Sequence, residues 1–183
     1  MKRLTLPLLL VSLLLIGCSK KEEHAVQSAL SKDKGAVAGI EWSVPGRWTI
    51  GAQRQMRVAT YVAPPAEGDS ESAECAVSFF GPGQGGNIDL NIDRWFGQFE
   101  GGTVPEKTSR EVNGVKVTTV KISGTYTSPG VMMQSMGKKP GYKLYGAIVE
   151  APEGTVFFKM TGPGKSVEAA EAEFDAMIGS LSK

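Results

Sequence analysis

The dipeptide Asn113-Gly114 constrains the fold of this 183-residue chain more than any other feature of its sequence. It lies between two strand-like segments, residues 106–112 and 115–122. Asn followed by Gly readily adopts the positive φ angles of a two-residue turn, whose twist matches that of two antiparallel strands. The sequence therefore predicts a β-hairpin across these segments.

Other short segments also have the spacing of strands. Residues 40–44 alternate apolar and polar side chains, which is the pattern of a half-buried strand, and Pro45-Gly46 supplies a turn after them. Residues 143–151 and 155–161 flank Pro152-Glu153-Gly154 and predict a second hairpin. The remaining predicted strands are residues 48–50, 56–62 and 73–80.

Two segments repeat apolar residues at the period of a helix. Residues 87–99 begin with a strand-like alternation, but the helical pattern covers the whole segment and is favoured for that reason. Asn87 or Asp89 is a suitable N-cap for this helix. In the final segment Ser166 is the expected N-cap, and the apolar face consists of Val167, Ala170, Phe174, Met177, Ile178 and Leu181.

The order of these elements predicts an α+β fold. A doubly wound parallel sheet requires helices that alternate with strands, and this sequence lacks that alternation. We expect a mostly antiparallel sheet of about six or seven strands, packed by two or three helices. The length suits a single domain, which we expect to span residues 40–183.

The N-terminus resembles that of a bacterial lipoprotein. A short basic region precedes an apolar run, residues 4–16, that is too short to span a bilayer comfortably and is typical of a removed signal. The run ends in Leu15-Ile16-Gly17-Cys18, which resembles the lipobox, where the cysteine is acylated and becomes the first mature residue. The resemblance implies a signal peptide over residues 1–17 and a lipidated Cys18 with a flexible tether over residues 18–39.

The resemblance also implies a location. The inner-membrane retention signal of enterobacterial lipoproteins is Asp after the cysteine, and this chain has Ser19 there. We therefore expect attachment to the outer membrane, facing the periplasm, in a cell that has one. Two or more acyl chains hold a protein on a membrane stably, whereas a single chain binds marginally.

Charge and cysteine content narrow the function classes. Removal of Lys2 and Arg3 from the 20 basic residues leaves 18 against 19 acidic ones, so the mature chain is near neutral and has no basic stripe. This excludes the electrostatic case for nucleic-acid binding. If Cys18 carries lipid, Cys75 has no disulfide partner, and its apolar, strand-like surroundings predict a buried, inert thiol.

From Ile40 onward the chain contains, in order, the motifs Val44-Pro45-Gly46-Arg47-Trp48, Arg94-Trp95, Gly146-Ala147-Ile148-Val149-Glu150, Phe158-Lys159-Met160-Thr161-Gly162-Pro163 and Met177-Ile178-Gly179-Ser180-Leu181. In these motifs it is similar to a group of uncharacterised bacterial lipoproteins and, more distantly, to the PsbP-like α/β/α fold. That resemblance implies a binding or assembly role and brings no catalytic residues with it.

Residues 81–86 match the G-x-G-x-x-G pattern of dinucleotide-binding turns between a predicted strand and a predicted helix. A hairpin follows instead of a parallel return strand, so we interpret the match as a strand-to-helix turn and expect no cofactor. Free amides at the start of that helix, around Gly85, Gly86 and Asn87, form a candidate anion site.

The sequence lacks the usual parts of a catalytic or zinc site. There is no G-x-S-x-G motif, no zinc-ligand spacing, and the single histidine, His24, falls in the predicted tether. Asp and Glu are too numerous to rank, so a carboxylate-based hydrolase acting on envelope material stays an alternative function.

The long glycine-rich segment 125–142, predicted to be a loop, is the candidate surface for a partner or ligand. Its candidate contact residues are Met132, Met133, Met136, Lys138, Lys139 and Tyr142. The three methionines can also present soft thioether ligands to Cu(I), so periplasmic copper binding is a second alternative. The favoured function is a non-enzymatic, lipid-anchored extracytoplasmic module that binds an envelope protein.

Overall fold

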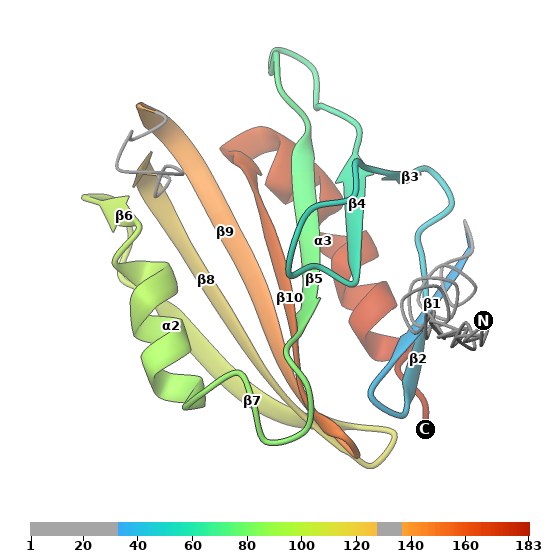
Figure 1. Cartoon of the computed structure of the whole chain (residues 1–183). Coiled ribbons are helices and arrows are strands. Elements are labelled where there is room, and N and C mark those ends of the chain that lie inside the picture. Colours follow the sequence, from blue (N-terminus) through green and yellow to red (C-terminus); the bar gives the residue numbers. More distant parts are fainter. Residues whose placement is uncertain (1–32, 128–136) are drawn as a thin grey trace, which may run out of the picture.

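The computed structural model describes residues 33–127 and 137–183 (Figure 1). In chain order the elements are β1 (Lys34–Val37), β2 (Ile40–Ser43), β3 (Thr49–Ile50), β4 (Ala59–Ala63), β5 (Ala73–Phe79), α2 (Ile88–Phe96), β6 (Phe99–Glu100), β7 (Glu106–Val112), β8 (Val115–Thr127), β9 (Lys138–Ala151), β10 (Gly154–Pro163) and α3 (Gly164–Gly179). The predicted α+β class with a mostly antiparallel sheet is confirmed.

Eight strands form the main sheet in the order β3-β4-β5-β10-β9-β8-β6, and β7 also pairs with β8. Both predicted hairpins are present, β7–β8 and β9–β10. In the first, Asn113 and Gly114 have φ angles of 47° and 78°, as the two-residue turn requires. Helix α2 lies on one face of the sheet and α3 on the other (Figure 1).

The alternation of side chains on β10 divides the core in two. Val156, Phe158 and Met160 point toward α3, and Phe157 points toward α2, because successive residues of a strand face opposite sides of the sheet. On the α2 side, Ile92 and Trp95 of the helix pack on Phe157 and its neighbours from β8 and β9. Each fully buried side chain of this size contributes roughly 1.5–3 kcal/mol.

The folded part of the chain begins earlier than the predicted start at Ile40. Strand β1 pairs with β2 in a separate two-stranded sheet, so residues 34–37 are not part of a flexible tether. This hairpin packs on the α3 side of the core, where the Trp42 ring meets Phe158 edge-on at 5.0 Å between centroids. The C-terminal residues close on it as well, since Glu41 and Ser182 exchange backbone hydrogen bonds of 2.9 and 3.1 Å.

Three other local predictions differ from the structure. The segment 125–142 is not a single long loop, because β8 continues to Thr127 and β9 begins at Lys138. The N-cap of α3 is Pro163, and Ser166 instead donates its hydroxyl to Asp69 Oδ2 at 2.7 Å. The strand predicted from Met56 starts only at Ala59, and Met56 itself is exposed with φ of 64°.

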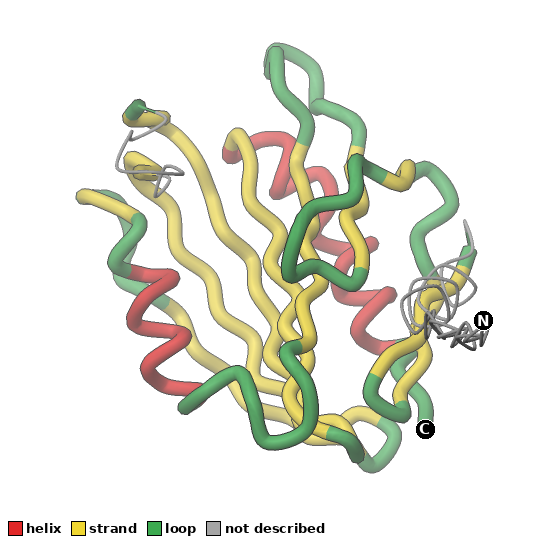
Figure 2. Tube along the Cα trace, in the orientation of Figure 1, coloured by secondary structure: helices red, strands yellow, loops and turns green. Residues whose placement is uncertain are grey.

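Helix α2 forms where the sequence predicts it, although it ends at Phe96, and Phe99 belongs to β6. The Asn87 side chain caps it by accepting a hydrogen bond from the Leu90 amide at 3.1 Å. Its two turns lie on the strands near one edge of the sheet and leave part of that face free of helix (Figure 2). Neither helix in the described part of the chain has the length and apolar character to cross a membrane.

Gly146 on β9 sets how closely α2 approaches the sheet. A Cβ at this position would lie 2.5 Å from the Trp95 ring, well inside contact distance. We therefore expect Gly146→Ala to lower the free energy of unfolding by about 1–3 kcal/mol, because the added methyl displaces Trp95. Denaturant unfolding measures this change.

Gly179→Ala is the matched control, since a Cβ there meets no atom within 4 Å. Its stability should be unchanged or slightly higher, as Ala favours helix. Equal stability of the two variants would contradict the close packing of Trp95 on Gly146.

Candidate functional site

The sequence predicts two separate candidate sites besides Cys18, and their described residues lie in different parts of the structure. Cys18, Met132, Met133 and Met136 lie outside the described residues. Lys138, Lys139 and Tyr142 lie at the start of β9, and Gly85, Gly86 and Asn87 lead into α2. Lys139 and Tyr142 line one hollow, whereas Gly85 lines a different one, beside Arg94.

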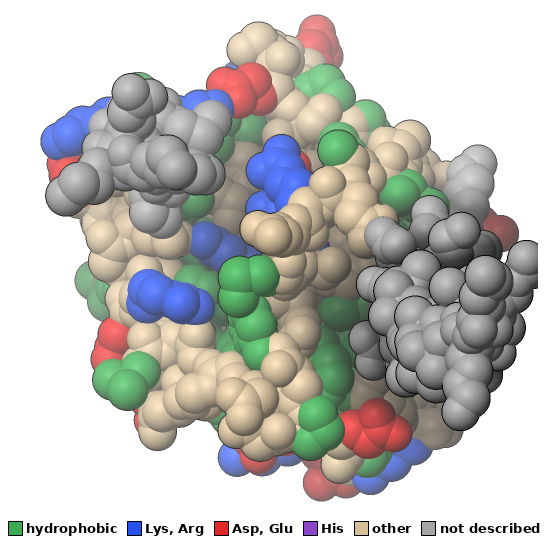
Figure 3. All heavy atoms as spheres, viewed as in Figure 1, with side chains coloured by type: hydrophobic (Ala, Val, Ile, Leu, Met, Phe, Trp, Pro, Cys, Tyr) green, Lys and Arg blue, Asp and Glu red, His purple; other side chains and the backbone are tan. Residues whose placement is uncertain are grey.

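The hollow that holds Lys139 and Tyr142 is the candidate site. It has a volume of about 290 Å³ and lies on the α2 face of the sheet. Lys and Arg side chains gather in the middle of this face, between α2 and the loop before β4 (Figure 3). We call it the basic hollow; its lining residues are Arg54, Arg57, Glu71, Ser72, Glu74, Ala76, Tyr126, Lys139, Tyr142, Lys159, Thr161 and Gly162.

Strand alternation explains how the central residues of the basic hollow reach one face. On β5 and β10, Lys159 is paired with Ala76, and Thr161 with Glu74. Because Cys75 points into the core on the α3 side, its neighbours on β5 point to the other face, as do Lys159 and Thr161 on β10. These residues are about 85 positions apart in sequence and meet through strand pairing alone.

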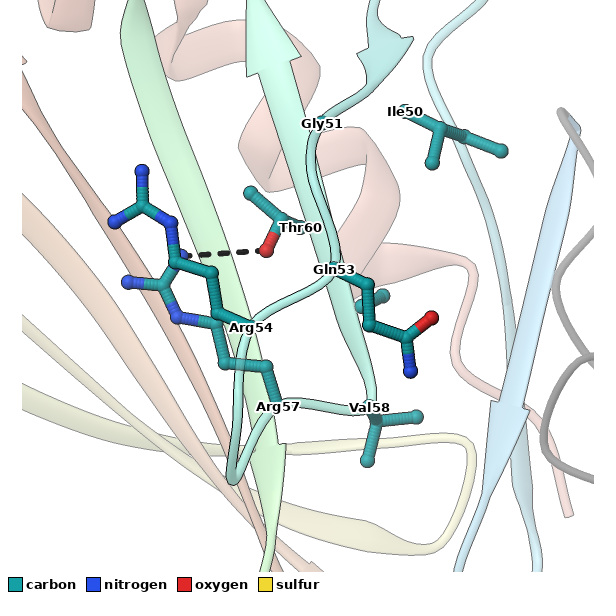
Figure 4. Close-up of a pocket in the computed structure, with 8 residues that line it drawn as sticks. Ile50, Gly51, Gln53, Arg54, Arg57, Val58 and Thr60 are labelled. Carbon is teal, nitrogen blue, oxygen red and sulfur yellow. Dashed lines mark hydrogen bonds between the residues drawn. The ribbon is translucent and has the colours of Figure 1, made fainter. Parts of the chain in front are cut away.

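The loop between β3 and β4 adds two arginines. Figure 4 shows the side chains of Arg54 and Arg57 on the same side of this loop, with Ile50, Gln53 and Val58 directed elsewhere. One carboxylate holds both arginines: Glu74 accepts from Arg57 Nη1 at 2.7 Å and from Arg54 Nη2 at 3.1 Å. Arg57 also donates to the Thr60 hydroxyl at 3.2 Å.

Among the four cations that line the basic hollow, Lys159 is the one that pairs with no described carboxylate. Its Nζ donates to Gln98 Oε1 and lies 5.9 and 5.6 Å from the ring centroids of Trp95 and Tyr126. Among the described residues, it forms no ion pair. Burial, together with the positive charges of Arg94 and Arg57, lowers the pKa of Lys159 from 10.5 to about 8.

A second ion pair closes the rim of the hollow. Glu71 accepts hydrogen bonds from Lys139 and from the Tyr142 hydroxyl, the latter at 2.9 Å. The hydrogen bond that Lys139 donates to Glu71 lowers the pKa of Glu71 and raises the pKa of Lys139. The Tyr142 ring stacks on Tyr126 at 5.8 Å. Lys138, in contrast, pairs with Glu100.

The other sequence hypotheses have local structural explanations. Gly85 and Gly86 have φ angles of 96° and 75°, and Asn91 bridges the carbonyls of Gly85 and Asn87. These contacts account for the glycine-rich turn, while the anion site there stays a prediction. Cys75 is buried, as predicted, and burial raises the pKa of its thiol. Over residues 33–127 and 137–183, no group of three or more metal-ligating His, Cys, Asp or Glu side chains occurs.

Sequence reasoning missed most of the basic hollow. Arg54, Arg57, Glu74 and Lys159 form no local motif, so spacing alone cannot connect them. One signal was present: Lys159 interrupts the apolar run of residues 156–160, in a strand whose two faces are both largely buried. A lysine in such a strand is unusual unless it is paired or lines a cavity.

Comparisons with known proteins identify structures with a similar fold but no relative of established function. No protein-family model matches the chain, and no curated protein matches it in sequence. It is similar to the crystal structure of PA94, a Pseudomonas aeruginosa protein of unknown function, with 11% identity over 75% of this chain and 98% of that one, at a TM-score of 0.47.

It is also similar to the solution structure of cyanobacterial PsbP from Synechocystis, with 10% identity over 84% of this chain and 94% of that one, at a TM-score of 0.46. This second protein belongs to the PsbP-like group that the sequence resembles at a distance. Similarities at this level of identity concern the fold alone.

The lowered pKa of Lys159 predicts how stability depends on pH. Between pH about 8 and 10.5 the unfolded chain keeps a proton on this lysine that the folded chain has lost, so stability rises with pH in this window. Lys159→Met removes that rise. The variant should exceed the wild type in unfolding free energy below pH 8, by on the order of 1–3 kcal/mol, and lose this advantage toward pH 10.5.

Urea unfolding at several pH values measures this difference. The control is Lys165→Met, at an exposed lysine outside the basic hollow, measured over the same pH values. A pH-independent difference for Lys159→Met would show that Lys159 titrates as an ordinary lysine.

Proposed function

We propose that this protein is a lipid-anchored, extracytoplasmic binding module of the bacterial cell envelope that has no catalytic activity and holds its ligand in the basic hollow. The observation that carries the proposal is the hollow itself: four cationic side chains surround it, and only two carboxylates, Glu71 and Glu74, offset them. A preformed concave site with converging polar groups is typical of ligand binding.

The state of the two carboxylates favours binding over hydrolysis. A carboxyl group that acts as a general acid near neutral pH needs a raised pKa, whereas the pKa of Glu71 is lowered by its hydrogen bonds from Lys139 and Tyr142. Glu74 is engaged by Arg54 and Arg57. Both carboxylates therefore form ion pairs with basic side chains of the hollow, and neither has the state that the hydrolase alternative requires.

The proposed binding site shares some residues with the contact surface predicted from sequence but lies mainly on the face of the sheet. Lys139 and Tyr142 are members of that surface, and both line the basic hollow. The centre shifts from the segment after β8 to the sheet face, where Lys159 of β10 and the arginines of the β3–β4 loop converge. Copper binding by Met132, Met133 and Met136 stays an alternative, because these residues lie outside the described part of the chain.

Attachment through lipid has a direct test. Cys18→Ser removes the acylated thiol, so we expect the protein to move from the membrane fraction to the soluble fraction after cell fractionation, because Cys18 is the proposed site of every acyl chain. Cys75→Ser, at the buried thiol, is the control and should stay in the membrane fraction. Membrane retention of Cys18→Ser would argue against the lipid anchor.

Ligand binding can be tested on protein recovered from its own envelope under gentle detergent. Native mass spectrometry should detect a non-covalent mass on the wild type that is lost in Arg54→Ala/Arg57→Ala, because the variant removes two of the four cations around the hollow. Lys165→Ala, at an exposed lysine outside the hollow, should retain it. Absence of any retained mass on the wild type would count against the proposal.

A further inference from the structure

We infer that the basic hollow is a site for a small oxyanion, the carboxylate or phosphate group of a ligand, and that this group binds against Lys159. The inference rests on the proposed function and specifies the chemical class of its ligand. Three features of the hollow lead to it: an unpaired ammonium, two arginines with spare donors, and a surplus of positive charge.

The first feature is the position of Lys159. An ammonium group taken out of water costs several kcal/mol unless a negative charge or several acceptors compensate. Here the Nζ has a single acceptor among the described residues, Gln98 Oε1, and otherwise faces the Trp95 and Tyr126 rings. A lysine ammonium carries three N–H donors, so two remain for an anion in the hollow.

The second feature is the pair of arginines. A guanidinium group has five N–H donors in a planar fork that fits carboxylate and phosphate groups in a bidentate manner. Arg57 uses Nη1 for Glu74 and Thr60, and Arg54 uses Nη2 for the same Glu74. Among the described residues, the remaining donors of both groups have no acceptor, and they can bind an oxyanion on the side of the loop that faces β5 (Figure 4).

The third feature is the balance of charge and volume. The lining has four positive charges and two negative ones: Arg54, Arg57, Lys139 and Lys159, with Glu71 and Glu74. Arg94 on α2 adds a further positive charge that acts on Lys159, and it bonds to Asn91 without pairing with any described carboxylate. A volume of about 290 Å³ is at the lower end of the range for small-molecule pockets, which suits a compact anionic group.

Anion binding should depend on the protonation of Lys159. The charged or titratable groups around it are Arg94 on α2, Arg54 and Arg57 on the β3–β4 loop, Glu71 and Glu74 before and on β5, Tyr126 on β8, and Lys139 and Tyr142 on β9. A bound anion favours the ammonium form. Affinity should therefore fall as the pH rises above about 8, where the free protein loses this proton.

The test is a thermal unfolding titration of the full chain, purified in detergent, with inorganic phosphate, acetate and glycerol 1-phosphate at constant ionic strength and pH 7. A saturable rise in Tm is expected for the wild type, because a ligand that binds only the folded state stabilises it. Lys159→Met should weaken the apparent affinity by roughly tenfold or more, since it removes a charge-assisted hydrogen bond. Lys165→Met should titrate like the wild type.

Comparison of the probes separates the sources of the anion. A response to inorganic phosphate and to acetate indicates a soluble oxyanion, and a response to glycerol 1-phosphate alone indicates a lipid headgroup; either supports the inference. If Lys159→Met does not fold, Arg57→Ala replaces it, with the same expected loss of affinity.

Identical titrations of wild type and Lys159→Met, or no saturable response to any probe, would overturn the inference. The proposed function and the anion inference can fail separately. A retained mass in native mass spectrometry with no anion response would support ligand binding but overturn the oxyanion as its chemistry. An anion response without a retained mass would support the oxyanion site and count against a ligand held in the envelope.

Discussion

The placement of β10 in the middle of the sheet is the constraint on which the rest of the structure depends. It pairs with β5 on one side and β9 on the other, and α2 and α3 lie on its two faces. The alternation of side chains along this strand directs successive residues toward one helix or the other. Lys159 is the only charged residue of β10, and it lines the basic hollow.

The two helices are attached to the sheet by different interactions. α3 packs through an apolar face and through ion pairs. Its Glu171 carboxylate lies 2.8 Å from the Nζ atoms of both Lys121 and Lys143 on the sheet. Burial alone would raise the pKa of Glu171, but these bonds outweigh it and the net shift is downward. α2 is shorter and relies on Ile92 and Trp95. α2 covers only part of its face of the sheet (Figure 2), and the basic hollow lies on that same face.

The features that the sequence predicts well are those determined by neighbouring residues. The Asn113-Gly114 hairpin, the Asn87 cap of α2 and the apolar face of α3 all depend on a few adjacent side chains. β1 was not predicted, because the small residues Gly35 and Ala36 give it a weak strand pattern and its partner β2 supplies the large apolar residues.

The candidate site depends on contacts between distant segments. Arg57, Glu74 and Lys159 belong to three separate stretches, and the strand order β4-β5-β10 brings them together. No property of the individual stretches encodes that order, since several arrangements of the same strands satisfy their local patterns. Of the three predicted contact residues that the structure describes, Lys139 and Tyr142 line the hollow, whereas Lys138 pairs with Glu100.

Glu74 has a consequence for exchange at the hollow. Its carboxylate already occupies both arginines when no ligand is present, so it acts as an internal counter-ion that limits repulsion between them. An anion bound at these arginines would compete with this tethered carboxylate, so Glu74 sets how strongly an anion must interact with the hollow to displace it.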